Sequence, residues 1–212
     1  MTTTLLYLFD PLCGWCYGAS AAVSEAASST DIQFELLPSG LFSGSGARPM
    51  DDSFAAFAWS HDQRIERMTG QPFSERYRRD VLADRHQRLD SGPATLALTA
   101  VAMTAPQREL EALQAIQRAR YVEGRDVTKS WTLIDVLAAR GLDASAAMLA
   151  DSSAPLLEAS DSRTARARAL MRELGVNGVP AFVLEANGQR RLLRVDSLHS
   201  NPRSLVEHLA GT

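Results

Sequence analysis

Cysteine is scarce in this sequence. Its 212 residues contain two cysteines, Cys13 and Cys16, which lie three positions apart. A structural zinc site usually needs four ligands, and the histidines are scattered without the spacing of a metal-binding motif. We therefore predict no metal site and no cofactor, and a metal-binding protein is a minor alternative.

The sequence also lacks an excess of basic residues and any long apolar run. Lysine and arginine total 22 against 25 aspartates and glutamates, which does not favour nucleic acid or an anionic membrane as partner. No apolar run approaches the roughly 20 residues that cross a bilayer. The stretch Met1 to Thr4 carries no basic segment or cleavage site. We therefore expect a cytoplasmic protein, and in a reducing compartment a lone cysteine pair is more often catalytic than structural.

The two cysteines lie between a predicted strand and a predicted helix. The apolar run Leu5–Phe9 has the length of a buried strand, and Gly18–Ala27 has the composition of a helix. Cys13 falls at the helix start, with Gly14 and Trp15 between the two cysteines. A CxxC pair in this context is typical of a thioredoxin-like redox site. The alternative is a pair of inert buried thiols.

The place of each cysteine indicates its role. Because a thiolate attacks a disulfide and a helix N-terminus favours an anion, we expect the pKa of Cys13 to be lowered. Cys16 lies one turn on, on the same face, where it can attack a mixed disulfide formed at Cys13. Cys13 is thus the predicted nucleophile and Cys16 the predicted resolving cysteine.

The rest of the chain predicts strands on either side of a long helical block. Its length fits one domain, or one domain with a large insertion. Residues 53–151 show helical periodicity, including a charged surface helix at 74–87. Outside this block we expect a strand at 32–37, a helix at 160–174, strands at 181–185 and 191–195, and a last helix from Asn201.

The segment 39–52 is rich in glycine and serine, which predicts a flexible loop. It is either a plain connector or a mobile wall beside the thiols. In the second case, Leu41 and Phe42 would be its exposed apolar contacts.

This order of elements, together with several motifs, resembles the DsbA family of thioredoxin-fold proteins. Gly175–Val183 (GVNGVPAFV) is similar to the family's cis-proline loop. The family's helical-domain signature is similar to two stretches, Gln117–Val127 and Gly141-Leu142-Asp143. Gly40-Leu41-Phe42 and Thr69–Phe73 (TGQPF) resemble the cytosolic FrnE-like subgroup.

The resemblance implies an α/β protein with a thioredoxin-like domain, residues 1–52 and 152–212, whose mixed central sheet is interrupted by an inserted all-helical domain, residues 53–151. It implies a thiol–disulfide oxidoreductase, possible disulfide isomerase activity included. Its partners would be protein or small-molecule thiols and disulfides, glutathione among them. It also implies a cis Val179–Pro180 bond, with Pro180 packed against the thiols and the Val179 backbone pairing with an extended substrate.

Some positions depart from the family pattern. Gly14-Trp15 stands where DsbA has Pro-His, and a glycine followed by an aromatic residue resembles disulfide isomerases. Both residues are candidates for orienting substrate, and Trp15, which faces outward in this fold, is a candidate contact for apolar segments. Tyr7 occupies the position of thioredoxin's buried aspartate. Asp10 is then the nearest carboxylate, a candidate proton relay or helix cap, and N-cap preference favours the cap.

Other functions stay open. A kappa-class glutathione-dependent isomerase or transferase shares the fold, but that family carries a serine near position 13 and no cysteine pair. A redox-sensing or chaperone-like binder would use the segment 39–52. The direction of exchange, the electron donor and the oligomeric state do not follow from the sequence.

Overall fold

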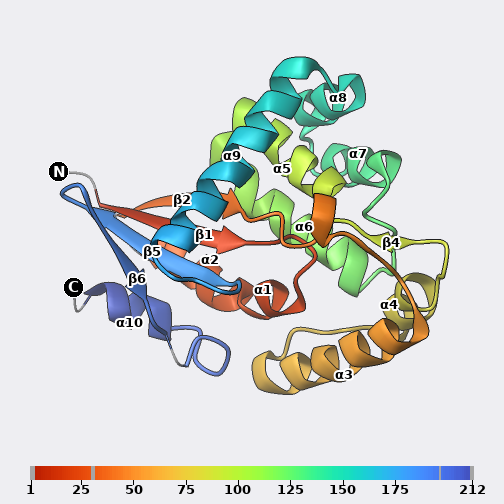
Figure 1. The fold of residues 1–212 in the computed structure, drawn as a ribbon, viewed down its shortest axis with the longest axis horizontal. Coiled ribbons are helices and arrows are strands. Elements are labelled where there is room, and N and C mark those ends of the chain that lie inside the picture. The colour runs from red at the N-terminus through yellow and green to blue at the C-terminus, as the bar shows by residue number, and fades with distance from the viewer. Residues whose placement is uncertain (1–2, 30–31, 196, 211–212) are drawn as a thin grey trace.

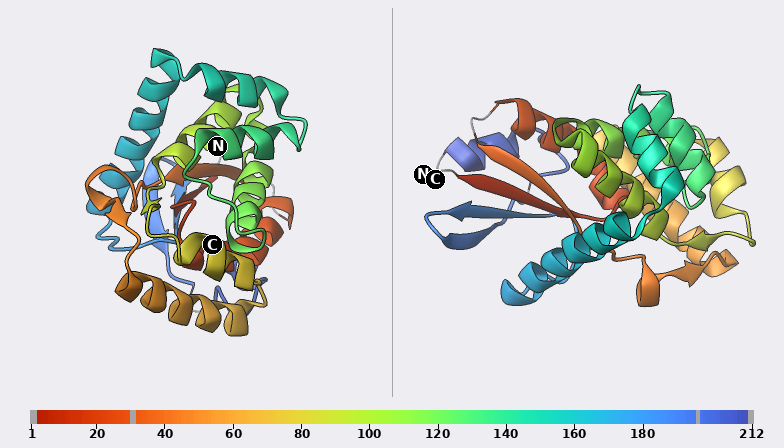
Figure 2. Two further views of the ribbon diagram at one scale, coloured as in Figure 1. Left: turned by 90° about the vertical axis from the view of Figure 1, so that its right-hand side faces the viewer. Right: turned by 90° about the horizontal axis from the view of Figure 1, so that it is seen from above.

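The computed structural model describes residues 3–29, 32–195 and 197–210. Residues 1–2 and 211–212 lie outside this description. The predictions made for Met1 to Thr4 and for the end of the thioredoxin-like domain therefore fall partly outside the described residues. A sheet occupies one end of the molecule and a group of helices the other (Figure 1). The long helix α9 (Ala154–Glu173) belongs to both ends, because it leaves the helices and runs along one face of the sheet (Figure 2).

The other elements have the following bounds. The strands are β1 (Thr4–Phe9), β2 (Gln33–Pro38), β3 (Arg48–Pro49), β4 (Arg88–Leu89), β5 (Ala181–Ala186) and β6 (Gln189–Leu193). The helices are α1 (Gly14–Gly18), α2 (Ser20–Ser29), α3 (Asp52–Thr69), α4 (Glu75–Tyr77), α5 (Gly92–Thr104), α6 (Glu109–Tyr121), α7 (Ser130–Ala138), α8 (Asp143–Asp151) and α10 (Ser204–Ala210). Shorter helical turns are η1 (Gly44–Gly46), η2 (Arg78–Leu82) and η3 (Pro106–Arg108).

The central sheet has the strand order β2-β1-β5-β6. β1 pairs in parallel with β2 and antiparallel with β5, and β6 is antiparallel to β5, so the predicted mixed sheet is confirmed. Successive side chains of a strand point to opposite faces. Tyr7 therefore joins the larger core cluster, whereas Leu6 and Leu8 pack with Ala167 and Leu170 of α9. Burial on both faces explains the continuous apolar run of β1.

The four strands of this sheet all lie outside residues 53–151, so the prediction of an α/β fold with an inserted helical region is confirmed. The division at residues 52/53 and 151/152 stays a prediction. The block is not purely helical, because β4 pairs with β3 at Arg48↔Leu89 and Pro49↔Arg88.

Two predicted helices differ from the structure. The segment 74–87 is not one helix: α4 passes into the π-helical turn η2, which closes with a bond from the Ala83 N–H to the Arg78 carbonyl. Tyr77, Val81 and Leu82 are buried there, so packing bends this segment toward the core. Helix α9 starts six residues before the predicted Ser160, with a proline in its first turn.

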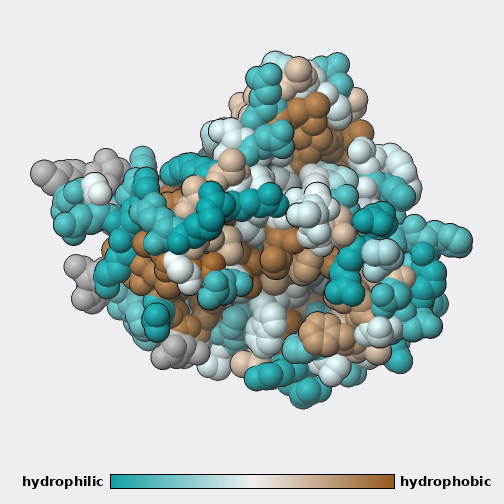
Figure 3. Space-filling model, viewed as in Figure 1, coloured by the Kyte–Doolittle hydropathy of each residue, from teal (hydrophilic) through white to brown (hydrophobic). Residues whose placement is uncertain are grey.

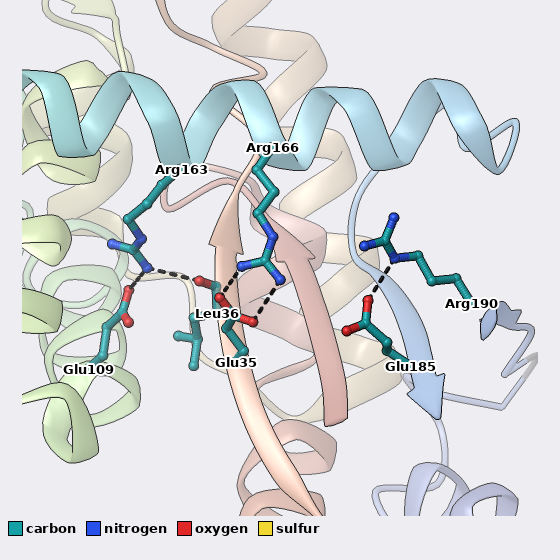
Figure 4. Close-up of polar contacts among 7 residues, drawn as sticks. All are labelled: Glu35, Leu36, Glu109, Arg163, Arg166, Glu185 and Arg190. Carbon is teal, nitrogen blue, oxygen red and sulfur yellow. Dashed lines mark hydrogen bonds and ion pairs between the residues drawn. The ribbon is translucent and has the colours of Figure 1, made fainter. Parts of the chain in front are cut away.

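Arginines of α9 connect the sheet to the helical region (Figure 4). Arg163 donates to the Leu36 carbonyl of β2 at 2.8 Å and forms an ion pair with Glu109 of α6. Arg166 pairs with Glu35 of β2, with Nη2–Oε2 at 3.0 Å. Burial raises the pKa of Glu109 to about 7, and Arg163 opposes that rise. These contacts join α9 to β2 and, through Arg163, to α6.

The surface is mixed in character. Figure 3 shows hydrophilic residues around several apolar patches on one face of the molecule. No helix within the described residues has both the length and the apolar character needed to cross a membrane.

Candidate active site

The turn after β1 places the cysteine pair. The Cys13 N–H donates to the Asp10 carbonyl at 3.1 Å, and the Leu12 N–H donates to Asp10 Oδ1 at 2.9 Å. Cys13 is the N-cap residue of α1, as the strand–turn–helix pattern predicts. The helix predicted to continue to Ala27 is divided at Ala19 into α1 and α2.

Both thiols are free and buried, with exposed fractions of 7% for Cys13 and 1% for Cys16. The Cys13 thiol lies 3.7 Å from the Val179 carbonyl oxygen, in the geometry of a weak hydrogen bond. Burial raises the pKa of Cys16 well above its ordinary value, and the neighbouring Cys13 raises it further. The two thiols therefore differ: Cys13 lies nearer the surface, and Cys16 resists ionisation.

The loop before β5 lies next to Cys13. Its Val179–Pro180 peptide bond is cis. The Val179 carbonyl is directed at Cys13, 166 positions away in the sequence. The packing of Pro180 against the thiols, which the resemblance implies, stays a prediction.

Asp10 does not cap the first helix, so that prediction is wrong. No side chain caps α1. The fully buried Asp10 carboxylate instead accepts hydrogen bonds from Leu12 N at 2.9 Å, Phe42 N at 3.1 Å and Ser91 Oγ at 2.7 Å. Asp10 thus ties the cysteine turn to the segment 39–52 and to the start of α5. Burial raises its pKa, which the hydrogen bond from Ser91 opposes.

The segment 39–52 is more regular than the predicted flexible loop. It contains η1 and β3, and Arg168 donates to the carbonyls of Ser39 at 2.9 Å and Gly40 at 2.8 Å. Leu41 is exposed and Phe42 half-buried, and both line a cavity next to Cys13. The segment therefore forms part of a wall beside the thiols, as one of the two interpretations predicts, but Phe42 is not exposed as expected, and the mobility of the segment stays a prediction.

This cavity has a volume of about 410 Å³. One part of its lining, which we call the sheet wall, includes Leu12, Cys13, Gly14, Trp15, Gly178 and Val179. A second part, which we call the helical wall, includes Asp62 of α3, Tyr77 of α4, and Arg120 and Tyr121 of α6.

The sequence analysis missed the helical wall. Tyr77 donates to Asp62 Oδ2 at 3.0 Å, and Tyr121 donates to the Leu12 carbonyl at 2.8 Å. The buried Arg120 guanidinium lies 5.4 Å from the centre of the Tyr77 ring and 5.7 Å from that of Tyr121. Burial raises the pKa of Asp62 to about 7, against the effects of Tyr77 and Arg120. One signal was present: Asp62 lies three residues before the core residue Ile65, on the inward face of α3.

Trp15 is half-buried, whereas the prediction was an outward ring. His199, which the sequence analysis treated as a scattered histidine, packs edge-on against it with ring centres 4.9 Å apart, and its Nε2 lies 3.1 Å from the Trp15 carbonyl. Arg64 of α3 lies over the indole at 5.8 Å. Burial lowers the pKa of His199.

Within the described residues, no three histidine, cysteine, aspartate or glutamate side chains are grouped so that they could hold a metal ion.

The chain is similar to proteins of a known family. A family model, the DSBA-like thioredoxin domain, matches residues 4–201. The cytosolic disulfide reductase DsbM from Pseudomonas aeruginosa is 33% identical, with a TM-score of 0.87 over 98% of this chain and 97% of that chain. Its structure with GSH gives 33% identity and a TM-score of 0.84 over 98% of each chain.

A structure from Nitrosomonas europaea, 23% identical over 100% of this chain and 97% of its own, shares the fold with a TM-score of 0.81. Comparison with curated proteins gives no match. The family model covers nearly the whole chain and includes the CxxC turn, so the chain belongs to the DSBA-like thioredoxin domain family and is a thiol–disulfide oxidoreductase.

Proposed function

We propose that this protein is a cytosolic disulfide reductase of the FrnE-like subgroup that uses glutathione or a similar small thiol. The observation that carries the proposal is the Cys13 thiol, which lies 3.7 Å from the Val179 carbonyl at the wall of a cavity. The 33% identity to a cytosolic disulfide reductase, also solved with GSH, supports the direction and the donor. Leu41 and Phe42, in the motif typical of the subgroup, line the same cavity.

Cys13 is the proposed nucleophile. Its thiolate attacks one sulfur of a substrate disulfide, which forms a mixed disulfide at Cys13 and releases the other sulfur as a thiolate. The Cys16 thiolate then attacks the Cys13 sulfur, releases the second substrate thiolate and leaves a Cys13–Cys16 disulfide. Two molecules of a thiol such as glutathione reduce this disulfide and are themselves oxidised to a disulfide.

Asp10 is the proposed proton relay for Cys16. Cys16 must lose its proton before it attacks, although burial raises its pKa. Asp10 is a buried carboxylate whose charge acts on Cys16, and burial raises the pKa of Asp10 too. A carboxylate with a raised pKa is a better proton acceptor, which suits this role.

Val179 and Pro180 are proposed to orient the substrate, because the Val179 backbone is held against the attacking sulfur. An extended disulfide-bearing segment would pair with this backbone in the manner of an added strand. Gly14, Trp15 and the exposed Phe57 of α3, which line the same cavity, would then contact the segment.

Trapping of the mixed disulfide tests the proposal. Cys16→Ser mixed with oxidised glutathione should gain one covalent glutathione at Cys13, seen by intact-protein and peptide mass, whereas the wild type should not accumulate it. Cys13→Ser is the matched control and should gain none. A glutathione adduct on Cys16 in that control, with none on Cys13 in the first variant, would reverse the assigned roles.

The reduction potential of the Cys13–Cys16 pair tests the direction. A potential near or below the cytosolic glutathione poise supports a reductase. A much higher potential would assign the protein to oxidation or isomerisation instead.

A further inference from the structure

Gly14, the first of the two residues between the cysteines, leaves no room for a side chain. A Cβ built on Gly14 would lie 2.5 Å from Asp62 Oδ1 and 3.2 Å from Ile65 Cδ1. Real Cβ atoms essentially never come within 3.0 Å of such an atom, so the α3 carboxylate lies directly over the backbone next to Cys13. The glycine therefore admits a charged group from another part of the chain to the CxxC turn.

Asp62 is held firmly in this place. Its side chain is 5% exposed, and its Oδ2 accepts the 3.0 Å hydrogen bond from Tyr77. The cation that acts on it is Arg120, which is 2% exposed and has an Nε without a hydrogen-bond partner. The carboxylate and guanidinium thus share a buried site, where charges interact more strongly than in water.

The charged and titratable groups around Asp62 come from several elements. Those that line the same cavity are His61 of α3, Arg48 of β3, Tyr77 of α4, Arg120 and Tyr121 of α6, and Cys13. Arg48 lies over the Phe54 ring at 4.4 Å, and His61 packs on the Phe57 ring at 4.3 Å. These two side chains are engaged with aromatic rings, which leaves Arg120 as the main counter-charge of Asp62.

We propose that Asp62 is a positioning residue that controls how readily Cys13 ionises. An ionised Asp62 neutralises Arg120 and disfavours a second anion at Cys13. A protonated Asp62 leaves the Arg120 charge uncompensated, and the thiolate is favoured. Stabilising the thiolate favours the reduced pair and makes it more oxidising, so the ionised carboxylate makes the pair more reducing. Because the pKa of Asp62 is raised to about 7, this control operates near neutral pH.

The inference rests on the proposed role of Cys13, so the test measures Cys13 directly. In a Cys16→Ser background, the rate of alkylation by iodoacetamide is followed from pH 5 to 10, with the site mapped by peptide mass. Asp62→Asn should lower the Cys13 midpoint by about one pH unit and remove the inflection near pH 7. Glu158→Gln, the loss of one exposed negative charge on α9, is the matched control and should leave the profile unchanged.

The equilibrium with glutathione gives a second readout. In the protein that keeps both cysteines, Asp62→Asn should shift the equilibrium constant for exchange with glutathione toward the reduced cysteine pair by up to about tenfold. Tyr77→Phe keeps the carboxylate but removes the hydrogen bond that lowers its pKa, so the wild-type inflection should move to higher pH. This variant keeps the test valid should Asp62→Asn fail to fold.

Failure of this inference can be distinguished from failure of the proposed function. Unchanged profiles in both Asp62→Asn and Tyr77→Phe, or a raised Cys13 midpoint in Asp62→Asn, would overturn the inference while Cys13 remained the reactive cysteine. An unreactive Cys13 in the Cys16→Ser background would instead overturn the proposed function.

Discussion

The two walls of the active-site cavity are built in different ways. The sheet wall takes its form from backbone: a strand end, a tight turn and a cis-proline loop bring Cys13 to the Val179 carbonyl. The helical wall is made of buried polar side chains from α3, α4 and α6, which bond to one another and, through Tyr121, to Leu12. Local backbone thus places the reacting sulfur, and tertiary packing sets the charges around it.

The largest expected difference between the walls is in activity. Cys13→Ser removes the sulfur that forms the new bond, so disulfide reduction with glutathione should fall about a thousandfold or more. Asp62→Asn in the helical wall should retain measurable turnover. The measurement is reduction of a small disulfide coupled to glutathione reductase. Comparable losses in the two variants would remove the distinction between the walls.

The next effect is on stability. Arg120→Met removes the cation that faces Asp62 in a buried site, and an uncompensated buried charge costs about 3 kcal/mol, which protonation of Asp62 would limit. Arg118→Met on the same helix is the control: the Arg118 side chain is 59% exposed, so its replacement should cost less than about 0.5 kcal/mol. Urea unfolding at pH 7.5 measures both. Equal losses would contradict a stabilising interaction between Arg120 and Asp62.

A third variant tests the junction of the walls. Gly14→Ala places a methyl group 2.5 Å from Asp62 Oδ1, so either the α3 side chain or the cysteine turn must shift, at about 1–3 kcal/mol. Gly178→Ala, on the same cavity, is the matched control because nothing lies within 4 Å of its Cβ position. Thermal unfolding of both proteins is the measurement, and a Gly14→Ala protein as stable as the control would contradict the close approach.

Asp62 in the helical wall should make the stability of the protein depend on pH. Burial raises the folded-state pKa of Asp62 from 3.8 to about 7, so between these values the folded protein binds the additional proton. The contribution of Asp62 to stability is therefore greatest below pH 4 and is lost as pH rises to 7, by at most about 1.4 kcal/mol per pH unit. Asp62→Asn lacks this loss, so its stability relative to wild type should increase with pH. A difference that stays constant from pH 4.5 to 7 in urea unfolding would contradict the raised pKa.

The sequence predicted the sheet wall because its signals are local. A strand, a CxxC pair and a GVPAF segment each occupy a few consecutive residues. The helical wall joins Asp62 to Arg120, 58 positions apart, through packing that no local pattern encodes. The same reason explains two other errors. Asp10 was assigned to the nearest helix although its partners Phe42 and Ser91 lie far along the chain, and residues 74–87 bend where their side chains meet the core.

The smallest expected effect is at the rim of the sheet wall. Trp15 is half-buried against His199 but still lines the cavity, so its ring offers part of one face to a bound segment. Trp15→Ala should raise the KM for an unfolded protein disulfide about two- to fivefold and leave kcat nearly unchanged, because the lost contact is equal in the bound and transition states. A small disulfide, which does not reach the ring, should react as with wild type. If turnover of the small disulfide falls to the same extent, Trp15 acts by holding the cysteine turn through its packing with His199, and the substrate-contact role is wrong.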